Sequence, residues 1–327
     1  MIVSKTPYRL SLFGGGADYP AWYNENPSKV LSAAMNHYCY IHVKQLPPFH
    51  EHPIRVVYSK IENVDSVDQI EHPSIRACLK FLNITDGISI GHEGDLPARS
   101  GIGSSSSFTV GLLNALYQYK NIHKTQLELA QDAIHVEQNI IGESVGIQDQ
   151  IMAAHGGLKI IDMSNQGWNV NCLKTSPEYI DKFQDHILLG FSGISRFSEV
   201  QANKQIKNIE QGTSVDTLKK MQRWTNVAIE GFETEMDISL IGGILNETWK
   251  LKRRLAEGVS TDVIDTIYRT AIKAGAYGGK LMGAGGGGFF MFIAPPDKHE
   301  EIKQQVKQIN VWVPFKFDHD GSQIIMG

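Results

Sequence analysis

The first half of the chain contains several short segments in which hydrophobic and polar residues alternate, a pattern that predicts half-buried β-strands. In residues 7–13 the alternation is regular, and three glycines at 14–16 end it. Residues 73–82 instead have their apolar positions three or four residues apart, which predicts a helix. Further strands are expected at residues 30–46, 55–59 and 88–92.

Longer helical patterns follow. An apolar run with helical spacing begins at Phe108, directly after four serines, and reaches about Lys120. Thr125 and Glu128 form a capping-box pattern, which predicts a second helix to about Ile141. The other expected elements are a short irregular or helical piece at 147–155, a strand at 158–163, helices at 214–232, 238–257, 261–274 and 297–308, a strand at 289–293 that follows residues 280–282 and the glycine cluster, and two short strands around the turn at 320–321.

Strands and helices are mixed along the chain without a regular strand–helix–strand alternation, which predicts an α+β fold. The pattern is interrupted near residue 175, at Thr175-Ser176-Pro177, so we expect two domains, residues 1–175 and 176–327. The chain has 327 residues, of which 42% are hydrophobic, and this is enough for a substantial core.

The charges are nearly balanced, with 31 Lys and Arg against 35 Asp and Glu and a formal net charge of −4. Because no cluster of Lys or Arg stands out, we expect neither a nucleic acid nor an anionic membrane as a partner. The chain has three widely spaced cysteines, no signal-peptide pattern and no apolar run approaching the ~18 residues of a membrane span. These features predict a cytoplasmic globular protein.

The most informative stretch is residues 96–107, in which Gly101 and Gly103 precede four serines. A helix that begins there would direct its free N–H groups and its positive dipole end at the loop, which favours phosphate, and a serine hydroxyl could ligate Mg²⁺. The stretch lacks the Gly-Lys-Ser/Thr of a Walker A loop, and Ser106 replaces the third glycine of a dinucleotide fingerprint. The alternative is a flexible turn with one serine as helix cap. Four consecutive serines favour the phosphate loop.

A second glycine-rich segment, residues 283–288, contains five glycines and matches G-x-G-x-x-G literally. It precedes an apolar strand rather than a helix, so we do not expect a dinucleotide site. Either the segment is a plain hairpin loop, or its glycines allow the backbone to approach the same ligand as the serine loop.

Two carboxylates are candidates for chemistry. Glu137 falls in the apolar stripe of the helix that follows Thr125, where it would need a metal or a cation, but it could equally lie in solvent at a frayed helix end. Asp149 could take a hydroxyl proton or simply cap a helix. Arg9 and Asp18 have ordinary interpretations as a solvent-facing strand residue and a turn residue. The histidines lack a recurring ligand spacing, so no zinc site is expected.

Taken together, these motifs resemble those of the GHMP kinase family (galactokinase, homoserine, mevalonate and phosphomevalonate kinases). Residues 7–19, 95–107 and 280–289 resemble the three family motifs in order. The resemblance implies ATP-dependent phosphoryl transfer, an N-terminal domain of ribosomal protein S5 domain 2-like topology and a ferredoxin-like α+β C-terminal domain. Within the family, the glycines at 14–16 and residues 92–101 are most similar to D-glycero-D-manno-heptose 7-phosphate kinases, whereas galactokinases carry Gly-Glu-His at the first motif.

The resemblance also implies residue roles. Asp149 would face the acceptor hydroxyl, and Arg9 beside it would keep the carboxylate ionised. Ser105 and Glu137 would hold Mg²⁺. The residues expected to line the ATP phosphates are Gly101, Gly103, Ser104, Ser105 and Ser106, and those expected on the acceptor side are Gly16, Asp18, Gly285 and Gly286.

We therefore expect transfer of the ATP γ-phosphoryl group to the anomeric hydroxyl of D-glycero-D-manno-heptose 7-phosphate, which gives the 1,7-bisphosphate. Two alternatives stay open: another anomeric sugar kinase, for example for fucose, and a catalytically silent sugar sensor on the same scaffold. The phosphate that the acceptor already carries requires a second anion site. The sequence does not rank the candidate cations, Lys29, Arg55, Arg99 and Arg196.

Overall fold

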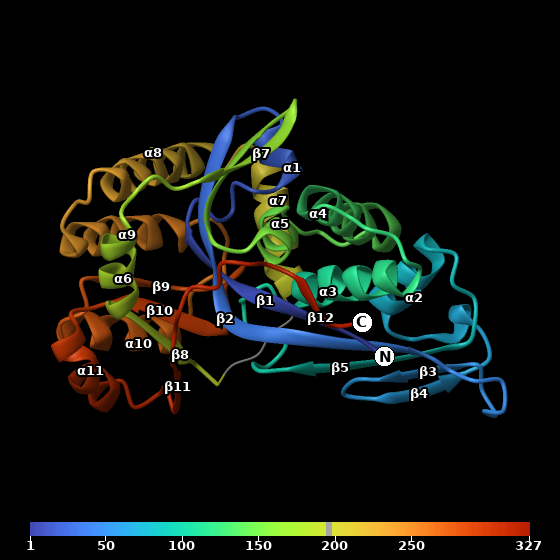
Figure 1. Cartoon of the computed structure of the whole chain (residues 1–327). Helices are drawn as coiled ribbons and strands as arrows, with labels where there is room; N and C mark the ends of the chain where they lie inside the picture. Colours follow the sequence, from blue (N-terminus) through green and yellow to red (C-terminus); the bar gives the residue numbers. More distant parts are fainter. Residues whose placement is uncertain (194–197) are drawn as a thin grey trace.

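The structure is a computed structural model that describes residues 1–193 and 198–327, and two sheets with helices packed against them form its frame (Figure 1). The strands of the larger sheet are β1 (Ile2–Phe13), β2 (Ser28–Gln45), β3 (Ile54–Val57), β4 (Ile61–Val64), β5 (Ile88–Gly94), β6 (Leu158–Ser164), β7 (Gly167–Cys172) and β12 (Gln323–Met326). They lie in the order β12-β1-β2-β5-β3-β4, and β6 and β7 extend from the start of β2. All pairs are antiparallel except β3 with β5.

Four helices lie on one side of this sheet: α3 (Ser104–Tyr119) and α5 (Gln148–His155) pack on its strands, whereas α2 (Pro73–Phe81) packs on α3 and α4 (Gln126–His135) packs on α3 and α5 (Figure 1). The central helix α3 packs against β1 and β2, and it is buried along most of its length, which is typical of a helix that is apolar on all sides. Glycine at position 111 allows the close approach to β1, because a Cβ there would lie 2.7 Å from Oγ1 of Thr6. This packing fixes where the first turn of α3 points.

The smaller sheet is antiparallel, in the order β11-β8-β10-β9. Its strands are β8 (Ile187–Phe191), β9 (Gly278–Leu281), β10 (Phe289–Ile293) and β11 (Val311–Val313). Helix α9 (Ile238–Lys252) packs on β9 and β10 and contacts α8 (Val215–Glu233). The remaining helices are α1 (Pro20–Tyr23), α6 (Pro177–Asp185), α7 (Ser198–Glu210), α10 (Asp262–Lys273) and α11 (His299–Gln305).

Most of the expected elements are present. The elements that were not expected include α1 (Pro20–Tyr23), β4, β7, α6 (Pro177–Asp185), α7 (Ser198–Glu210) and β8. The helix capped by Thr125 and Glu128 does reach Ile141, but its last turn, η2 (Val136–Ile141), is π-helical. The two strands expected around residues 320–321 do not form a hairpin, because β11 joins the smaller sheet and β12 pairs with β1 in the larger one. Strand β8 was not expected, because a five-residue apolar run has no diagnostic period.

The two sheets meet where β1 ends. Lys280, in β9, donates from Nζ to the carbonyl oxygens of Ser11 (2.6 Å) and Leu12 (3.2 Å) in β1. Burial, followed by repulsion from Lys252 and Arg9, lowers the pKa of Lys280 well below its usual range. This buried contact holds residues 280–289 against residues 7–19, at the junction of the two sheets.

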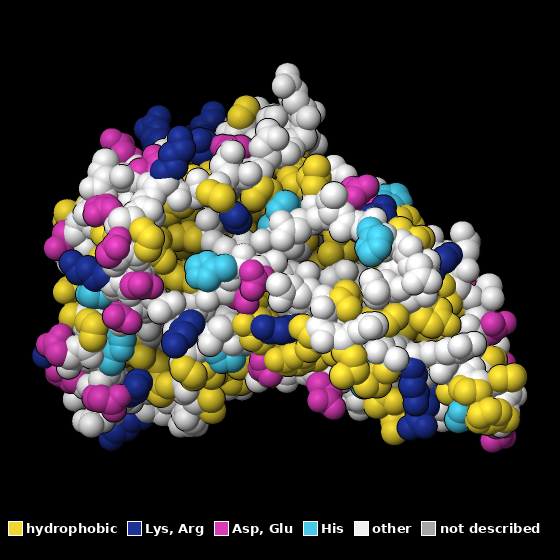
Figure 2. All heavy atoms as spheres, viewed as in Figure 1, with side chains coloured by type: hydrophobic (Ala, Val, Ile, Leu, Met, Phe, Trp, Pro, Cys, Tyr) yellow, Lys and Arg dark blue, Asp and Glu magenta, His cyan; other side chains and the backbone are white. Residues whose placement is uncertain are grey.

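Acidic and basic side chains are interspersed over the face of the molecule in Figure 2. Among residues 1–193 and 198–327, no helix is both long enough and apolar enough to cross a bilayer.

Candidate active site

A cleft of about 1020 Å³ lies at the junction of the two sheets. Residues of β1, β5, α3, α5, α7, α9 and the glycine segment 283–288 line it. The volume is at the upper end of the range for small-molecule sites, which suits a nucleotide together with a second substrate. Segments separated by more than 100 residues in the sequence therefore form one site.

The serine loop leads directly into α3, as the sequence predicts. Gly101 (φ 82°) and Gly103 (φ 75°) adopt left-handed backbone conformations, which favour glycine. Gly103 is the residue before the helix, and Ser104, Ser105 and Ser106 form its first turn and line the cleft. The first N–H groups of a helix have no partner within the helix, so this turn presents backbone donors and a positive dipole end to the cleft. The geometry favours an anion.

The two glycine-rich segments touch through their backbones. A Cβ on Gly101 would lie 2.6 Å from the carbonyl oxygen of Met282, and a Cβ on Gly288 would lie 2.3 Å from that of Ser100. The amide of Phe289 donates to Ser100 O over 2.9 Å. Segment 283–288 is therefore a loop that packs on the serine loop, rather than a plain hairpin turn.

The two ends of segment 283–288 lie in different surroundings. Gly283 and Ala284 line the cleft. Gly285 and Gly286 are buried beside Val259: a Cβ on Gly285 would lie 2.7 Å from Val259 Cα, and the amide of Gly286 donates to Val259 O over 3.1 Å. Thus the first two residues of the segment face the cleft, and the next two hold the loop in position.

Arg9 and Asp149 form a bidentate ion pair inside the cleft. Nε of Arg9 lies 2.6 Å from Oδ1 of Asp149, and Nη2 lies 2.7 Å from Oδ2. The third donor, Nη1, contacts the carbonyl oxygen of Gly101 at 2.6 Å. Arg9 is buried and does not face solvent, whereas the side chain of Asp149 is 25% exposed. A partly exposed carboxylate is thus fixed beside the serine loop.

Asp18 lies at the same end of the cleft. Its Oδ1 accepts from the amide of Gly16 over 3.0 Å. Burial, followed by repulsion from Asp149, raises the pKa of Asp18. The approach of Asp18 to α5 depends on Gly146, where a Cβ would lie 1.9 Å from Oδ2. Asp18 is therefore a positioned side chain of the cleft wall rather than an ordinary turn residue.

Glu137 is fully buried in the π-helical turn η2. Its Oε2 accepts from the hydroxyl of Ser106 over 2.9 Å and from the side-chain amide of Gln150. Its Oε1 is buried without a hydrogen-bond partner among the described residues, and burial raises the pKa of Glu137 to about 7. A buried carboxylate oxygen without a partner and a neighbouring hydroxyl fit a divalent cation that takes oxygen ligands.

Of the four serines, it is Ser106 whose hydroxyl contacts Glu137, and Ser105 is exposed on the cleft side of the same turn. A magnesium ion typically takes one or two carboxylates together with substrate phosphates, rather than an all-protein cage. Accordingly, a single glutamate below the phosphate loop is a sufficient protein carboxylate for such a site.

Two further side chains fix the cleft-facing end of segment 283–288, and the sequence analysis missed both. Nζ of Lys252 donates to Gly283 O over 2.6 Å, and Nε2 of Gln205 donates to Ala284 O over 2.7 Å. Burial, followed by repulsion from Arg9, lowers the pKa of Lys252 to about 8. The sequence did carry a signal for the burial of Lys252. It lies three residues after Trp249, which is buried, so the two residues share one face of the helix.

The other end of the cleft carries an aromatic cluster that the sequence analysis also missed. The rings of His72 and Phe108 are stacked with centroids 4.7 Å apart, and Tyr58 and His92 contact this pair edge-on at 5.0 Å. All four side chains line the cleft. Burial, followed by the neighbouring His92, lowers the pKa of His72 to about 4, so its imidazole is neutral at pH 7. Flat uncharged rings suit a planar ligand.

The four cations considered from the sequence for a second anion site occupy different places. Lys29 pairs with Asp162 at 3.2 Å outside the cleft, and Arg55 lies in β3 away from the cleft lining. Arg99 lines the cleft within the phosphate loop. Arg196 lies outside the described residues.

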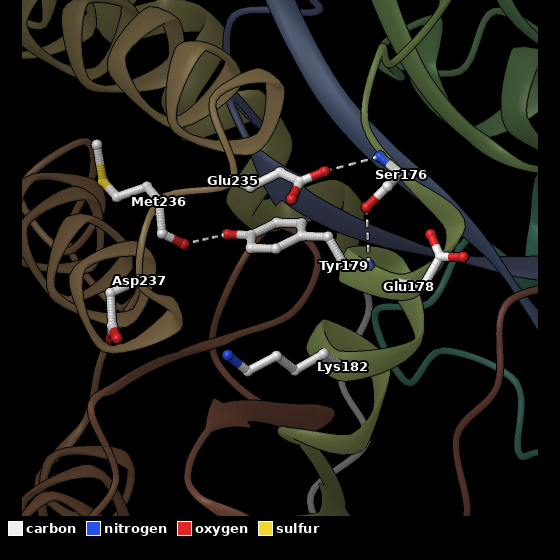
Figure 3. A pocket seen from close by; sticks show the side chains of 7 residues that line it. All are labelled: Ser176, Glu178, Tyr179, Lys182, Glu235, Met236 and Asp237. Atoms are coloured by element: carbon white, nitrogen blue, oxygen red, sulfur yellow. Dashed lines mark hydrogen bonds between the residues drawn. The ribbon is translucent and has the colours of Figure 1, made fainter.

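A second hollow of about 470 Å³ lies between α6 and the connection from α8 to α9 (Figure 3). Several polar groups of its lining are hydrogen-bonded to one another. Tyr179 donates from its hydroxyl to Met236 O, and the amide of Ser176 donates to the carboxylate of Glu235 over 3.2 Å. These contacts join α6 to the connection between α8 and α9, so we assign this hollow a structural role.

Two family models match the chain. The GHMP kinase N-terminal domain matches residues 73–157, and the GHMP kinase C-terminal domain matches residues 228–310. The first range contains the serine loop, Glu137 and Asp149, and the second contains Lys252 and segment 283–288. The two-domain α+β fold expected from the sequence is confirmed.

Individual relatives extend this result. A D-glycero-alpha-D-manno-heptose 7-phosphate kinase from Campylobacter jejuni is 29% identical over 98% of this chain and 97% of its own length. A bifunctional fucokinase/GDP-fucose pyrophosphorylase from Arabidopsis thaliana is 28% identical over 68% of this chain and 21% of its own length. The solved structure of a D-glycero-D-manno-heptose 1-phosphate kinase from Bacteroides thetaiotaomicron has a TM-score of 0.79 at 24% identity and covers 100% of this chain and 99% of that one. The similarity to this solved structure shows that the two chains share the same fold.

Proposed function

We propose that this chain, which belongs to the GHMP kinase family, phosphorylates the anomeric hydroxyl of D-glycero-D-manno-heptose 7-phosphate. Family membership makes it an ATP-dependent phosphotransferase. The relative from Campylobacter jejuni, which aligns over 98% of this chain, supports a sugar phosphate as the acceptor. The choice of heptose rests on the relative from Campylobacter jejuni, which aligns over nearly the whole chain. The structural observation that carries the proposal is the bidentate pair of Arg9 and Asp149 beside the phosphate loop.

The nucleotide would lie with its base against the aromatic cluster and its phosphates on the first turn of α3. Phe108 belongs to both regions, because it lies in α3 four residues after Ser104 and stacks on His72. Gly101, Gly103, Ser104, Ser105 and Ser106 would line the phosphates with backbone and hydroxyl donors. Phosphoryl transfer depends mainly on positioning and charge neutralisation, which this arrangement supplies.

Mg²⁺, held by Ser105 and Glu137, would neutralise the charge of the β- and γ-phosphates. Ser106, whose hydroxyl already contacts Glu137, would orient that carboxylate. The buried Oε1 of Glu137, which has no hydrogen-bond partner among the described residues, supports this role.

Asp149 would accept the proton of the anomeric hydroxyl while the sugar oxygen forms its bond to the γ-phosphorus and the bond from that phosphorus to the ADP oxygen breaks. Its Oδ2 lies next to the phosphate loop, since a Cβ on Gly103 would be 3.2 Å from it. Arg9 would hold the carboxylate in this orientation through two hydrogen bonds. An anomeric hydroxyl is more acidic than an ordinary alcohol, so a carboxylate is a sufficient base.

The acceptor would lie between Asp149 and Asp18, with Asp18 and Gly16 contacting sugar hydroxyls. Gly285 and Gly286 would act on this side by keeping the loop close to Val259, so that Gly283 and Ala284 reach the acceptor.

We also propose that the chain divides into two domains, residues 1–175 and 176–327, with residues 323–326 returning to the larger sheet. A cytoplasmic location is part of the same proposal.

The test is ADP release by the purified chain over a panel of sugars and sugar phosphates, with and without Mg²⁺. We expect Mg²⁺-dependent turnover with D-glycero-D-manno-heptose 7-phosphate and little with fucose or galactose. Preferred turnover of fucose would support the fucokinase-like alternative that the Arabidopsis relative raises. Absence of turnover with every acceptor would refute the kinase and leave the sensor.

A further inference from the structure

Lys252, the last residue of α9, is a buried cation in the cleft wall to which the phosphoryl transfer proposed above assigns no role. Its side chain is buried, and Nζ donates to Gly283 O over 2.6 Å. An ammonium group carries three N–H donors, so two remain for a molecule in the cleft. Burial of a cation is costly unless an anion compensates its charge, so we expect an anionic group of a ligand beside Lys252.

Lys252 belongs to the acceptor end of the cleft. Its Nζ is bonded to Gly283 O in the cleft wall, and its charge interacts with Arg9 and then with Asp18 and Asp149, the two carboxylates between which we place the sugar. The aromatic cluster lies at the other end, where Phe108 and His72 stack. A ligand group that reaches Lys252 is therefore part of the acceptor or the phosphoryl group in transfer, and not the nucleoside.

We propose, on the basis of the proposed function, that Lys252 binds the phosphate group that the acceptor sugar already carries. The other cations near the junction have different partners. Arg9 makes three hydrogen bonds to Asp149 and Gly101, and Lys280 contacts the carbonyl oxygens at the end of β1. Arg99 lies in the phosphate loop itself.

The charges of the acceptor end favour a further cation there, because Arg9 is already paired with Asp149. Two carboxylates, Asp18 and Asp149, lie there, and a phosphate monoester brings about −1.5 to −2 further charges. Lys252 offsets this repulsion, and its bond to Gly283 O fixes the ammonium to the loop that packs on Gly101. The chain therefore recognises a phosphorylated sugar with the same loop that contacts the phosphate loop.

The experiment compares two acceptors, D-glycero-D-manno-heptose 7-phosphate and the unphosphorylated heptose, in wild-type protein and Lys252→Met. We expect Lys252→Met to raise KM for the 7-phosphate about 10- to 100-fold, as for the loss of a hydrogen bond to a charged group. KM for the free heptose and KM for ATP should each change less than about threefold, because neither involves the phosphate at C7. Lys250→Met, on the exposed face of the same helix, is the matched control and should behave as wild type.

Lys252→Gln keeps a donor for Gly283 O without the charge and serves if the methionine variant fails to fold. A loss of kcat that is equal for both acceptors would overturn the inference, because it would place Lys252 on the transferred phosphoryl group or on the loop alone. An unchanged KM ratio would overturn it as well, with the proposed function intact. Wild-type protein that phosphorylates neither acceptor would instead overturn the proposed function, and this inference with it.

Discussion

Arg9 and Asp149 are 140 residues apart in the chain, yet they share two hydrogen bonds of 2.6 and 2.7 Å. The pair joins β1 to the first turn of α5, and the third guanidinium donor reaches Gly101 in the phosphate loop. One arginine thus fixes the candidate base relative to the phosphate site.

Replacing Asp149 with Asn should lower kcat at least ~10²-fold, because an amide cannot accept the acceptor's proton. The affinity for ATP should change little, because the substitution keeps the size of the side chain beside Gly103. Single-turnover kinetics and nucleotide titration measure the two quantities. Near-normal turnover of the Asp149→Asn protein would remove Asp149 from the chemistry, and a loss of nucleotide binding would point to a damaged loop instead.

Replacing Glu137 with Gln should raise the Mg²⁺ concentration for half-maximal activity about tenfold or more, because an amide oxygen is a weaker ligand than a carboxylate. Gln is close in size to Glu, and its side-chain oxygen can still accept from Ser106. The measurement is a Mg²⁺ titration of ADP release at saturating ATP and acceptor. The same titration curve in both proteins would exclude Glu137 from metal binding.

Secondary structure was largely predictable because the amphipathic helices and long strands carry clear periods. The capping box of Thr125 and Glu128 forms as its pattern indicates, with Glu128 bonded back to the Thr125 amide. Strand β8 was missed because its apolar run lacks polar punctuation. The return of β12 to the larger sheet depends on contacts between the two chain ends, which no local pattern encodes.

The site was predictable only in part. The serine loop has a local physical signature, so its place at the start of α3 follows from the sequence. Periodicity could not decide whether Glu137 is buried or whether Arg9 faces the cleft, since each depends on partners far along the chain. Only the family resemblance suggested these roles. Lys252 was missed because a lysine near a helix end is ordinarily an exposed residue.

The contact between the two glycine loops leads to a stability prediction. Gly101→Ala adds a Cβ 2.6 Å from Met282 O at a φ of 82°, whereas Gly212→Ala has a similar φ of 74° and meets nothing within 4 Å. The control should therefore lose only the ~1–2 kcal/mol of a left-handed alanine. Gly101→Ala should lose more than this and bind ATP at least ~10-fold more weakly, since the loop must shift. Denaturant unfolding and nucleotide titration give the comparison, and equal losses in both variants would contradict the close packing.

The pH dependence of acceptor use should report Lys252. Its pKa, about 8 against an ordinary 10.5, lies low because burial and Arg9 outweigh the opposite effects of Asp18 and Asp149. Lys280 is a further cation that interacts with it. As pH rises through about 8 the free protein loses the ammonium charge, so kcat/KM for heptose 7-phosphate should fall. Lys252→Arg, which stays charged, should shift this fall to higher pH. Superimposable alkaline profiles of the two proteins would contradict the assignment.

The position of the new phosphate tests the central claim most directly. The purified chain is incubated with ATP, Mg²⁺ and D-glycero-D-manno-heptose 7-phosphate, and the proton-coupled ³¹P NMR spectrum of the sugar product is recorded. We predict a second phosphate signal, coupled to the anomeric proton alone, beside the unchanged signal of the phosphate at C7. A new phosphate coupled to protons of any other carbon, or a sugar phosphate recovered unaltered while ATP stays intact, would contradict the account.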